Sequence, residues 1–203
     1  ELIRLQIWDF GGQEIMHSMH RFFLTERTLY VIVINARDNT QDERAEYWLN
    51  NVKNFANGCP VIMVLNKMDQ NPTASINERL LRNDYPQIVK IIKMSAMKDN
   101  VEKFGELMST VISTIRTFDS YAMDFPVSWN KIKIRLMEMN SNYITDREYR
   151  KICSQYMVED EQIQNWLLDW FHDLGISFNY HKKDQLLGAY MVLKPTWITN
   201  AIY

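Results

Sequence analysis

The sequence predicts an α/β protein in which a mostly parallel sheet with flanking helices is followed by a mainly helical α+β part. In the first 117 residues, apolar runs rich in β-branched side chains alternate with stretches of helical periodicity. Beyond the proline at position 126 the patterns are mostly helical. Strands that alternate with helices favour parallel pairing through right-handed crossovers. We therefore expect a parallel sheet in the first part and a helical second part.

The strands of the first part are expected at residues 2–8, 29–34, 61–65 and 88–92. The second and third runs are continuously apolar, which is typical of central parallel strands covered on both faces. Helices are expected at residues 42–55, 76–82 and 101–116. The last of these has apolar side chains at helical spacing, namely Phe104, Leu107, Met108, Val111, Ile112 and Ile115.

The second part begins after a stretch without clear periodicity at residues 118–126, which we interpret as a linker. A helix is expected at 127–139, and the pattern from Thr145 to Glu148 is a capping box that predicts the start of the next helix. A third helix carries a broad apolar stripe, and Gly175 is its expected C-terminal cap. Residues 176–180 and 189–193 are expected to pair as a small hairpin. The predicted domains are thus 1–117 and 127–203.

Composition is that of an ordinary globular protein, with 46% hydrophobic and 24% charged residues and a net charge of −2. No basic excess indicates nucleic acid or anionic lipid as a partner. No apolar run approaches the roughly 20 residues that span a bilayer. Two cysteines do not make a disulfide framework, which favours a reducing, cytoplasmic location. The four histidines form no zinc pattern with them. Because the chain begins at Glu1 without a methionine, this is not expected to be its natural start.

Three short polar segments follow expected strands. They are Asp9-Phe10-Gly11-Gly12-Gln13, Asn66-Lys67-Met68-Asp69 and Ser95-Ala96. Ligands of such sheets gather beyond the carboxyl ends of the strands, so we expect the three segments to meet at one edge.

The second and third segments carry the chemistry that recognises guanine. A carboxylate at Asp69 can accept from both N1–H and the 2-amino group, a pair of donors that adenine does not present. Asn66 would brace the loop and reach the other edge of the base, while Lys67 would lay its aliphatic stem along the ring. The backbone N–H of Ala96 would meet the guanine oxygen, which requires a small side chain at that position.

The first segment carries the chemistry of the phosphate end. Asp9 would hold Mg²⁺, Gly12 would bring a backbone N–H close to a γ-phosphate, and Gln13 would orient the attacking water. For Asp9 and Gln13 alone, a strand-end turn with a solvated amide is an alternative. The sequence contains no Gly-x-x-x-x-Gly-Lys-Ser/Thr phosphate-binding motif.

Asp9-Phe10-Gly11 also spells the metal-binding triplet of protein kinases. That interpretation requires a His-Arg-Asp catalytic loop upstream and an Ala-Pro-Glu motif downstream, and neither occurs. The kinase interpretation is therefore rejected.

The chain resembles the Roc domain, the Ras-like P-loop GTPase of Roco proteins, joined to a COR domain. The Roc resemblance rests on residues 8–14, 20–25, 47–49 and 66–69, and the COR resemblance on Trp129, Glu148-Tyr149 and residues 172–176, 193–198 and 201–203. On this resemblance the chain is a Roc–COR segment that is truncated at both ends. Met97 stands where Ras-like proteins often carry Lys or Leu, and it joins the expected nucleotide-binding residues.

The resemblance implies GTP and GDP as ligands, with Mg²⁺, in a multidomain cytosolic protein. It further implies a homodimer formed through COR, and leucine-rich repeats or a kinase elsewhere in the same polypeptide. Two functional hypotheses follow. In the first, the parent protein is a slow GTPase switch whose nucleotide state is coupled to assembly, and the isolated chain is nearly inactive. The alternative is a non-catalytic Roc–COR scaffold or dimerisation module with an incomplete nucleotide site.

Overall fold

The computed structural model describes residues 5, 7–9, 24–38, 40–97, 101–118, 124–181, 186–194 and 197. The chain packs as two compact units. The sheet unit consists of Glu26–Met123, and the helical unit consists of Glu1–Thr25 together with Asp124–Tyr203. Within the described residues, no helix has the length and apolar character needed to cross a membrane.

The sheet unit is built on three parallel strands in the order β1 (Tyr30–Asn35), β2 (Val61–Asn66) and β3 (Ile88–Lys93). The central strand β2 is buried from Val61 to Leu65, as its continuous apolar run predicts. The register pairs Asn35 with Asn66 and Leu65 with Lys93, so the carboxyl ends of the strands lie together at one edge of the sheet.

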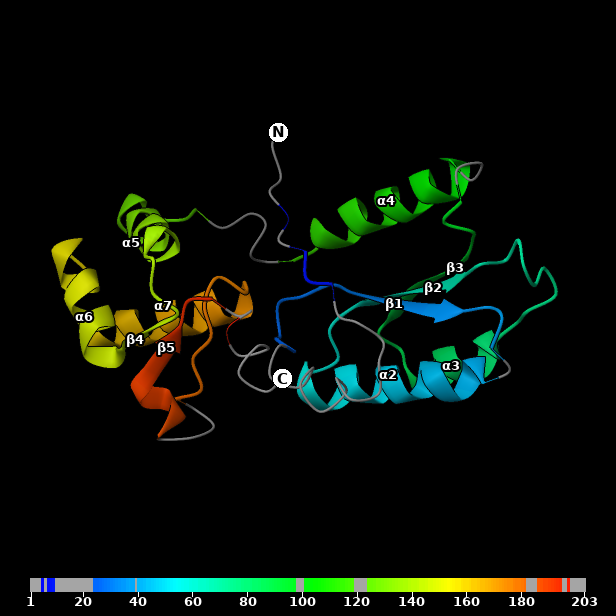
Figure 1. Cartoon of the computed structure of the whole chain (residues 1–203), viewed down its shortest axis with the longest axis horizontal. Coiled ribbons are helices and arrows are strands. Elements are labelled where there is room, and N and C mark those ends of the chain that lie inside the picture. Colours follow the sequence, from blue (N-terminus) through cyan, green and yellow to red (C-terminus); the bar gives the residue numbers. More distant parts are fainter. Residues whose placement is uncertain are drawn as a thin grey trace. The chain divides into compact units, whose positions relative to one another are not determined.

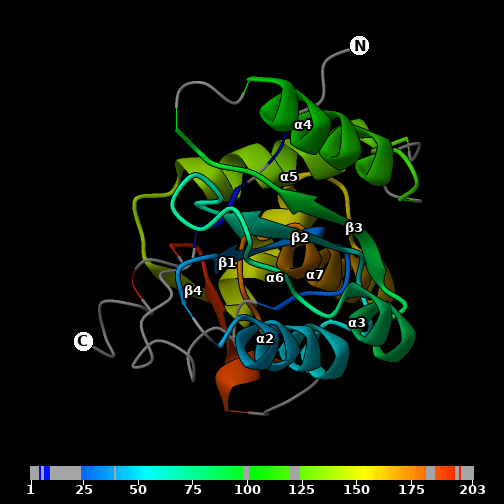
Figure 2. The ribbon, with the colours of Figure 1, turned by 90° about the vertical axis from the view of Figure 1, so that its right-hand side faces the viewer.

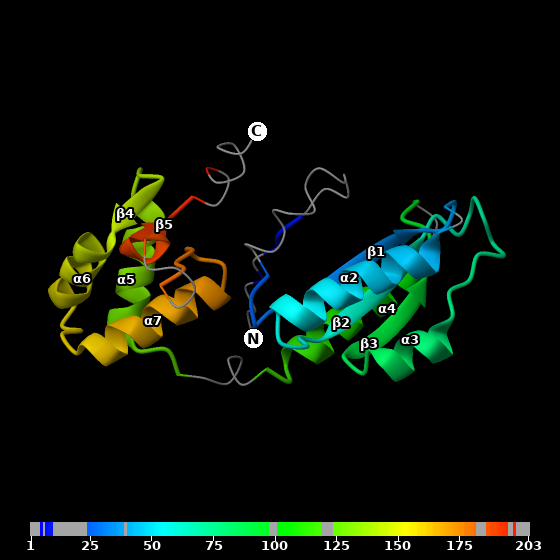
Figure 3. The same cartoon turned by 90° about the horizontal axis from the view of Figure 1, so that it is seen from below.

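Helices cover both faces of this sheet. Helix α4 (Val101–Ile115) lies on one face, and α2 (Gln41–Phe55) and α3 (Glu78–Asp84) lie on the other, as Figures 1, 2 and 3 show from three directions. On the α4 side, Leu107 and Val111 pack against buried side chains of β2 and β3. The three predicted helices of the first part are confirmed within two residues at each end.

The strand predicted at residues 2–8 is wrong for the residues that the structure describes there. Leu5 and residues 7–9 are in no strand, and this part of the chain belongs to the helical unit. There Trp8 packs against the buried side chains of Phe178 and Val192. An apolar run alone does not decide which of its side chains are buried or against which surface, because Trp8 is half-buried here whereas Ile7 is 84% exposed.

The helical unit contains α5 (Val127–Glu138), α6 (Asp146–Gln155), α7 (Glu161–Asp173), a 3-10 turn η3 (Leu187–Ala189) and a two-stranded antiparallel sheet of β4 (Tyr143–Thr145) and β5 (Tyr190–Val192). Its core gathers apolar side chains from all three α-helices and both strands. Those more than nine-tenths buried are Ile132, Leu136, Ile144, Tyr149, Ile152, Cys153, Val158, Leu167, Leu168, Trp170, Phe171 and Met191.

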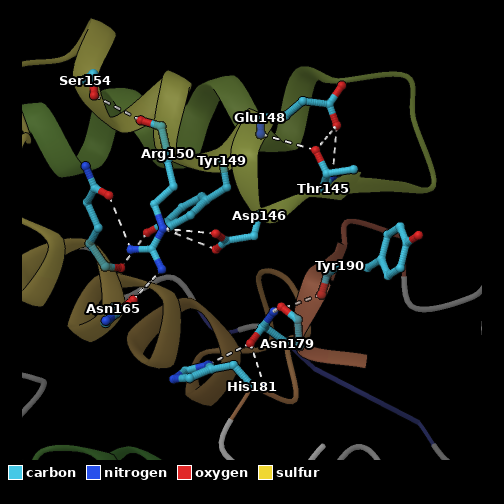
Figure 4. Close-up of polar contacts among 12 residues, drawn as sticks. Thr145, Asp146, Glu148, Tyr149, Arg150, Ser154, Asn165, Asn179, His181 and Tyr190 are labelled. Atoms are coloured by element: carbon cyan, nitrogen blue, oxygen red, sulfur yellow. Dashed lines mark hydrogen bonds and ion pairs between the residues drawn. The ribbon is translucent and has the colours of Figure 1, made fainter. Parts of the chain in front are cut away.

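The predicted capping box is confirmed. The Thr145 hydroxyl accepts from the Glu148 N–H, while the Glu148 carboxylate accepts from the Thr145 N–H at 2.8 Å. Figure 4 shows this pair beside Arg150, whose guanidinium donates to Asp146 on its own helix and to Asn165 on α7. These polar contacts set where α6 begins and tie it to α7.

The predicted hairpin is confirmed only at one pair of residues. Phe178 and Val192 form a single antiparallel bridge, with both backbone hydrogen bonds at 2.8 Å. The strand partner of β5 is β4, which the sequence did not predict. A three-residue strand carries too little alternation to be recognised from its own residues.

Candidate nucleotide-binding site

The second and third predicted segments meet beyond the carboxyl ends of β2 and β3. Backbone hydrogen bonds join the two connections, because the Met94 N–H donates to the Leu65 oxygen at 3.0 Å and the Met68 N–H donates to the Met94 oxygen at 3.2 Å. Residues almost thirty positions apart are thereby held side by side. The parallel sheet brings these segments together, as the sequence predicted.

Asn66, the last residue of β2, is the bridge between the segments. Its Oδ1 atom accepts from the Lys67 N–H at 2.8 Å and from the Ala96 N–H at 2.9 Å. These two bonds use both lone pairs of the amide oxygen, so the Asn66 amide NH₂ is oriented as a donor toward other groups. The N–H of Ala96, predicted to meet a guanine oxygen, donates to Asn66 in this structure.

Asp69 is held by the other segment. The Ser95 hydroxyl donates a hydrogen bond to Asp69 Oδ1. Ser95 is buried, whereas the carboxyl-bearing Asp69 is exposed. A carboxylate can accept about four hydrogen bonds, so the contact with Ser95 orients the group and leaves it able to accept from a ligand. Met97, the next predicted residue, is 68% exposed beside this pair.

Lys67 has a left-handed backbone conformation, with φ of +66°. A residue with a Cβ pays about 1–2 kcal/mol to adopt this conformation. The conformation permits a tight loop in which the Lys67 carbonyl oxygen accepts from the Gln70 N–H at 3.0 Å. The strained residue therefore shapes the loop that carries Asp69.

The predicted phosphate-end residues are Asp9, Gly12 and Gln13. Gly12 and Gln13 lie outside the described residues. Asp9 is exposed, lies in the helical unit and follows no strand in the part of the chain that is described, so the expectation that it follows a strand of this sheet is wrong.

The described residues contain no cluster of three or more His, Cys, Asp or Glu side chains that could hold a metal ion. A single carboxylate such as Asp9 suits Mg²⁺ only when water and phosphate oxygens complete the coordination sphere. Its predicted role as a Mg²⁺ ligand stays a prediction.

The assembled group contains the amide NH₂ of Asn66 as a donor and the carboxylate of Asp69 as an acceptor. The Ala96 N–H is engaged with Asn66 Oδ1. Guanine presents the complementary set, with N7 and O6 as acceptors and the 2-amino group as a donor. The chemical types of these groups match a guanine base better than an adenine base.

Comparison with known proteins agrees with this geometry. Residues 1–69 match the family "Ras of Complex, Roc, domain of DAPkinase", and residues 126–203 match "C-terminal of Roc, COR-A domain". The chain is a Roc–COR segment of the Roco family. The Roc match spans the expected Asp9 and Asn66–Asp69 motifs, and the COR-A match spans all helices of the second part.

Solved structures and curated proteins extend the comparison. A Methanosarcina barkeri Roco2 RocCORdC structure bound to GDP is 38% identical, with a TM-score of 0.86 over 97% of this chain and 58% of that one. A Roc-COR-CHAT protease from Runella zeae is 29% identical over 97% of this chain. The probable serine/threonine-protein kinase pats1 from Dictyostelium discoideum is 26% identical over 98%. This chain spans 22% and 6% of those two relatives.

The structural match confirms the predicted fold class, a partial Ras-like P-loop fold followed by a mainly helical COR part. Sequence reasoning missed one feature of the Roc–COR segment that bears on the site. The side chain of Asn71 contacts the main chain of Ala36, which follows β1. Asn is common in loops for local reasons, so nothing in the sequence marked this contact across 35 positions.

Proposed function

We propose that this Roc–COR segment supplies the base-recognition part of a guanine-nucleotide switch. The observation that carries the proposal is the joint arrangement of Asn66, Asp69, Ser95 and Ala96 at the carboxyl ends of β2 and β3. The GDP bound to the M. barkeri Roco2 structure supports it, because that protein is 38% identical to this chain.

In the proposed site, Asp69 accepts from N1–H and the 2-amino group of guanine. The Asn66 amide donates to the opposite edge of the base, where N7 and O6 lie. The Lys67 stem lies along the ring, and the Ala96 N–H exchanges its partner Asn66 for the guanine oxygen. Ser95 keeps the carboxylate of Asp69 in place through its hydroxyl.

The proposal for the whole protein is slow GTP hydrolysis coupled to COR-mediated assembly. Gly12 and Gln13 would serve the γ-phosphate and the attacking water, and Asp9 would hold Mg²⁺. A homodimer formed through COR, a cytosolic location, and leucine-rich repeats or a kinase in the same polypeptide are also parts of the proposal. They rest on the resemblance to Roco proteins, among which kinases occur.

The test is nucleotide binding by the natural full-length protein and by the 203-residue chain, measured with fluorescent GDP and with unlabelled GDP, ADP and XDP as competitors. We expect the full-length protein to prefer GDP over ADP by at least about tenfold, the discrimination given by one good bidentate base contact. Asp69→Asn replaces one carboxylate oxygen by an NH₂ donor. This variant should lose affinity for GDP and gain affinity for XDP, which presents an acceptor at the 2-position.

Glu78→Gln is the matched control, because it removes a carboxylate charge on α3, outside the four-residue group, and should leave the preference unchanged. Unchanged guanine selectivity in Asp69→Asn would contradict the proposed role of this loop. Equal, weak binding of all nucleotides by the full-length protein would favour the alternative, a non-catalytic scaffold.

A further inference from the structure

We propose that Asn71 is a positioning residue for guanine recognition, acting through the main chain of Ala36 to hold Asp69 in place. This inference rests on the proposed function of the same site. It concerns the loop of residues 67–70, which carries Asp69 between two points of attachment.

The first attachment is the end of the parallel ladder. The Ala36 N–H donates to the Asn66 oxygen at 2.8 Å, which extends the β1–β2 pairing one residue past Asn35. Ala36 is fully buried, and its backbone is joined to the last residue of β2 by this hydrogen bond.

The second attachment returns to the same residue. The Asn71 side-chain NH₂ donates to the Ala36 oxygen at 2.9 Å, across 35 positions of the chain. The other side of this amide is also engaged, because Asn71 Oδ1 accepts from the Thr73 hydroxyl at 3.1 Å. The orientation of the amide is thereby defined from both sides.

The Ala36 carbonyl oxygen accepts a further hydrogen bond, at 3.0 Å, from the side-chain NH₂ of Gln41, the first residue of α2. A carbonyl oxygen has two lone pairs, and both are used here. Losing the donor at Asn71 would therefore leave the buried carbonyl half-satisfied, with Gln41 as its remaining side-chain partner.

Both ends of the loop are thus tied to one buried residue, and Asp69 lies between them. A functional group acts selectively only when its supporting contacts hold it close to the productive geometry. With Asn71 removed, the loop keeps its attachments at Asn66, through the Met68 N–H to the Met94 oxygen and through the Ser95 hydroxyl to Asp69, but its far end is no longer tied to Ala36. The carboxylate then samples positions from which it meets N1–H but not the 2-amino group.

The role requires a donor at position 71, and this allows an isosteric test. Asn71→Asp keeps the size of the side chain but places a carboxylate against the Ala36 oxygen, which repels it. Asn71→Ala removes the contact without adding charge. Gln70→Glu makes the same change of amide to carboxylate one position earlier, on an exposed residue.

The experiment compares the affinities of GDP and IDP for the full-length protein and its variants. IDP lacks only the 2-amino group, so phosphate contacts cancel in the ratio. We expect wild type and Gln70→Glu to prefer GDP. We expect Asn71→Asp and Asn71→Ala to reduce this preference about fivefold, the factor for one neutral hydrogen bond of about 1 kcal/mol. Thermal unfolding of Asn71→Ala, with a midpoint within a few degrees of wild type, separates positioning from general loss of structure.

An unchanged GDP-to-IDP ratio in Asn71→Ala would overturn the inference while leaving the proposed function intact. A reduced ratio in Gln70→Glu as well would overturn it too, because added charge alone would then account for the effect. Should Asn71→Asp fail to fold, Asn71→Ala decides the matter. If the wild-type protein shows no preference for GDP over IDP, the proposed base recognition is contradicted. The inference about Asn71, which depends on it, is then contradicted as well.

Discussion

Gly175 lies against the indole ring of Trp8 so closely that a Cβ at position 175 would come within 2.7 Å of the indole nitrogen. Trp8 also packs edge-on against Phe178, with ring centroids 5.6 Å apart. On the other side of the undescribed residues 10–23, the Thr25 hydroxyl donates to the Asp173 oxygen at 3.1 Å. One turn at the end of α7 therefore holds the chain both before and after the Asp9–Gln13 motif.

The first prediction concerns this contact. Gly175→Ala should lower the free energy of unfolding by about 2 kcal/mol or more, because φ is +64° and the added methyl group meets the indole. Urea unfolding followed by circular dichroism measures the change. Combining it with Trp8→Phe should recover part of the loss, because the smaller ring makes room for the methyl group.

Gly58→Ala is the matched control for the backbone effect. Gly58 also has a left-handed φ, +69°, but nothing lies within 4 Å of the position of its Cβ. Gly58→Ala should lower the free energy of unfolding by only about 1 kcal/mol, which is the penalty of the backbone conformation alone. If Gly175→Ala lowers the free energy of unfolding by no more than Gly58→Ala does, the close packing of Trp8 on Gly175 makes no measurable contribution to stability.

The second prediction concerns the strained Lys67. Lys67→Gly should raise the free energy of unfolding by about 1 kcal/mol, since glycine adopts φ of +66° without steric cost. The same substitution should weaken GDP binding to the full-length protein severalfold, because the aliphatic stem is lost. Calorimetric unfolding and competition binding measure the two effects, which should have opposite signs.

Asn57→Gly provides the comparison, because Asn57 is also left-handed, with φ of +49°, and precedes β2 at the far end from the site. Asn57→Gly should raise the free energy of unfolding slightly and leave the affinity for GDP unchanged. Weaker binding in Asn57→Gly as well would show that the effect of Lys67→Gly does not come from contact with the base.

The third prediction concerns pH. Hydrogen bonds from Lys103, and then from Lys90, lower the pKa of Glu106 to about 2. Because the pKa is lower in the folded state, the stabilising contribution of Glu106 is present above pH 4.5 and is lost as the pH falls toward 2. The Glu106 side chain is half-buried, so screening by salt reduces this contribution.

An NMR titration of the Glu106 side-chain carboxyl carbon should give a midpoint well below that of an ordinary glutamate, and Lys103→Gln should raise it. Lys53→Gln, on α2, removes the same charge elsewhere and should leave the midpoint in place. A midpoint for Glu106 that does not respond to Lys103→Gln would contradict the assigned cause.

Several features of the fold follow from local sequence patterns. The continuous apolar run ending at Asn66 predicts β2 because a strand covered on both faces needs apolar residues throughout. Thr145 and Glu148 predict the start of α6 because the capping box satisfies otherwise unpaired N–H groups within four residues. Gly175 predicts the end of α7 because a left-handed residue commonly closes a helix.

Contacts between distant residues were harder to predict. Trp8 lies in a run with the pattern of a strand, yet it packs in the helical unit. The apolar character of an indole does not specify which surface it will pack against. β4 escaped notice because three residues are too few to show a period. Asn71 was missed because its partner, the oxygen of Ala36, is a main-chain atom that no residue type reveals.

For the candidate site, the sequence by itself determined which chemical groups are present: the amide of Asn66, the carboxylate of Asp69 and the hydroxyl of Ser95, each after an apolar run. The types of side chain and their place after a strand are local properties, so they can be recognised without a structure. Only the tertiary structure decided that Ser95 orients Asp69, that Asn66 holds Ala96 and that Asn71 returns to Ala36. Those contacts depend on the parallel register of the strands, and that register is set by packing across the whole sheet.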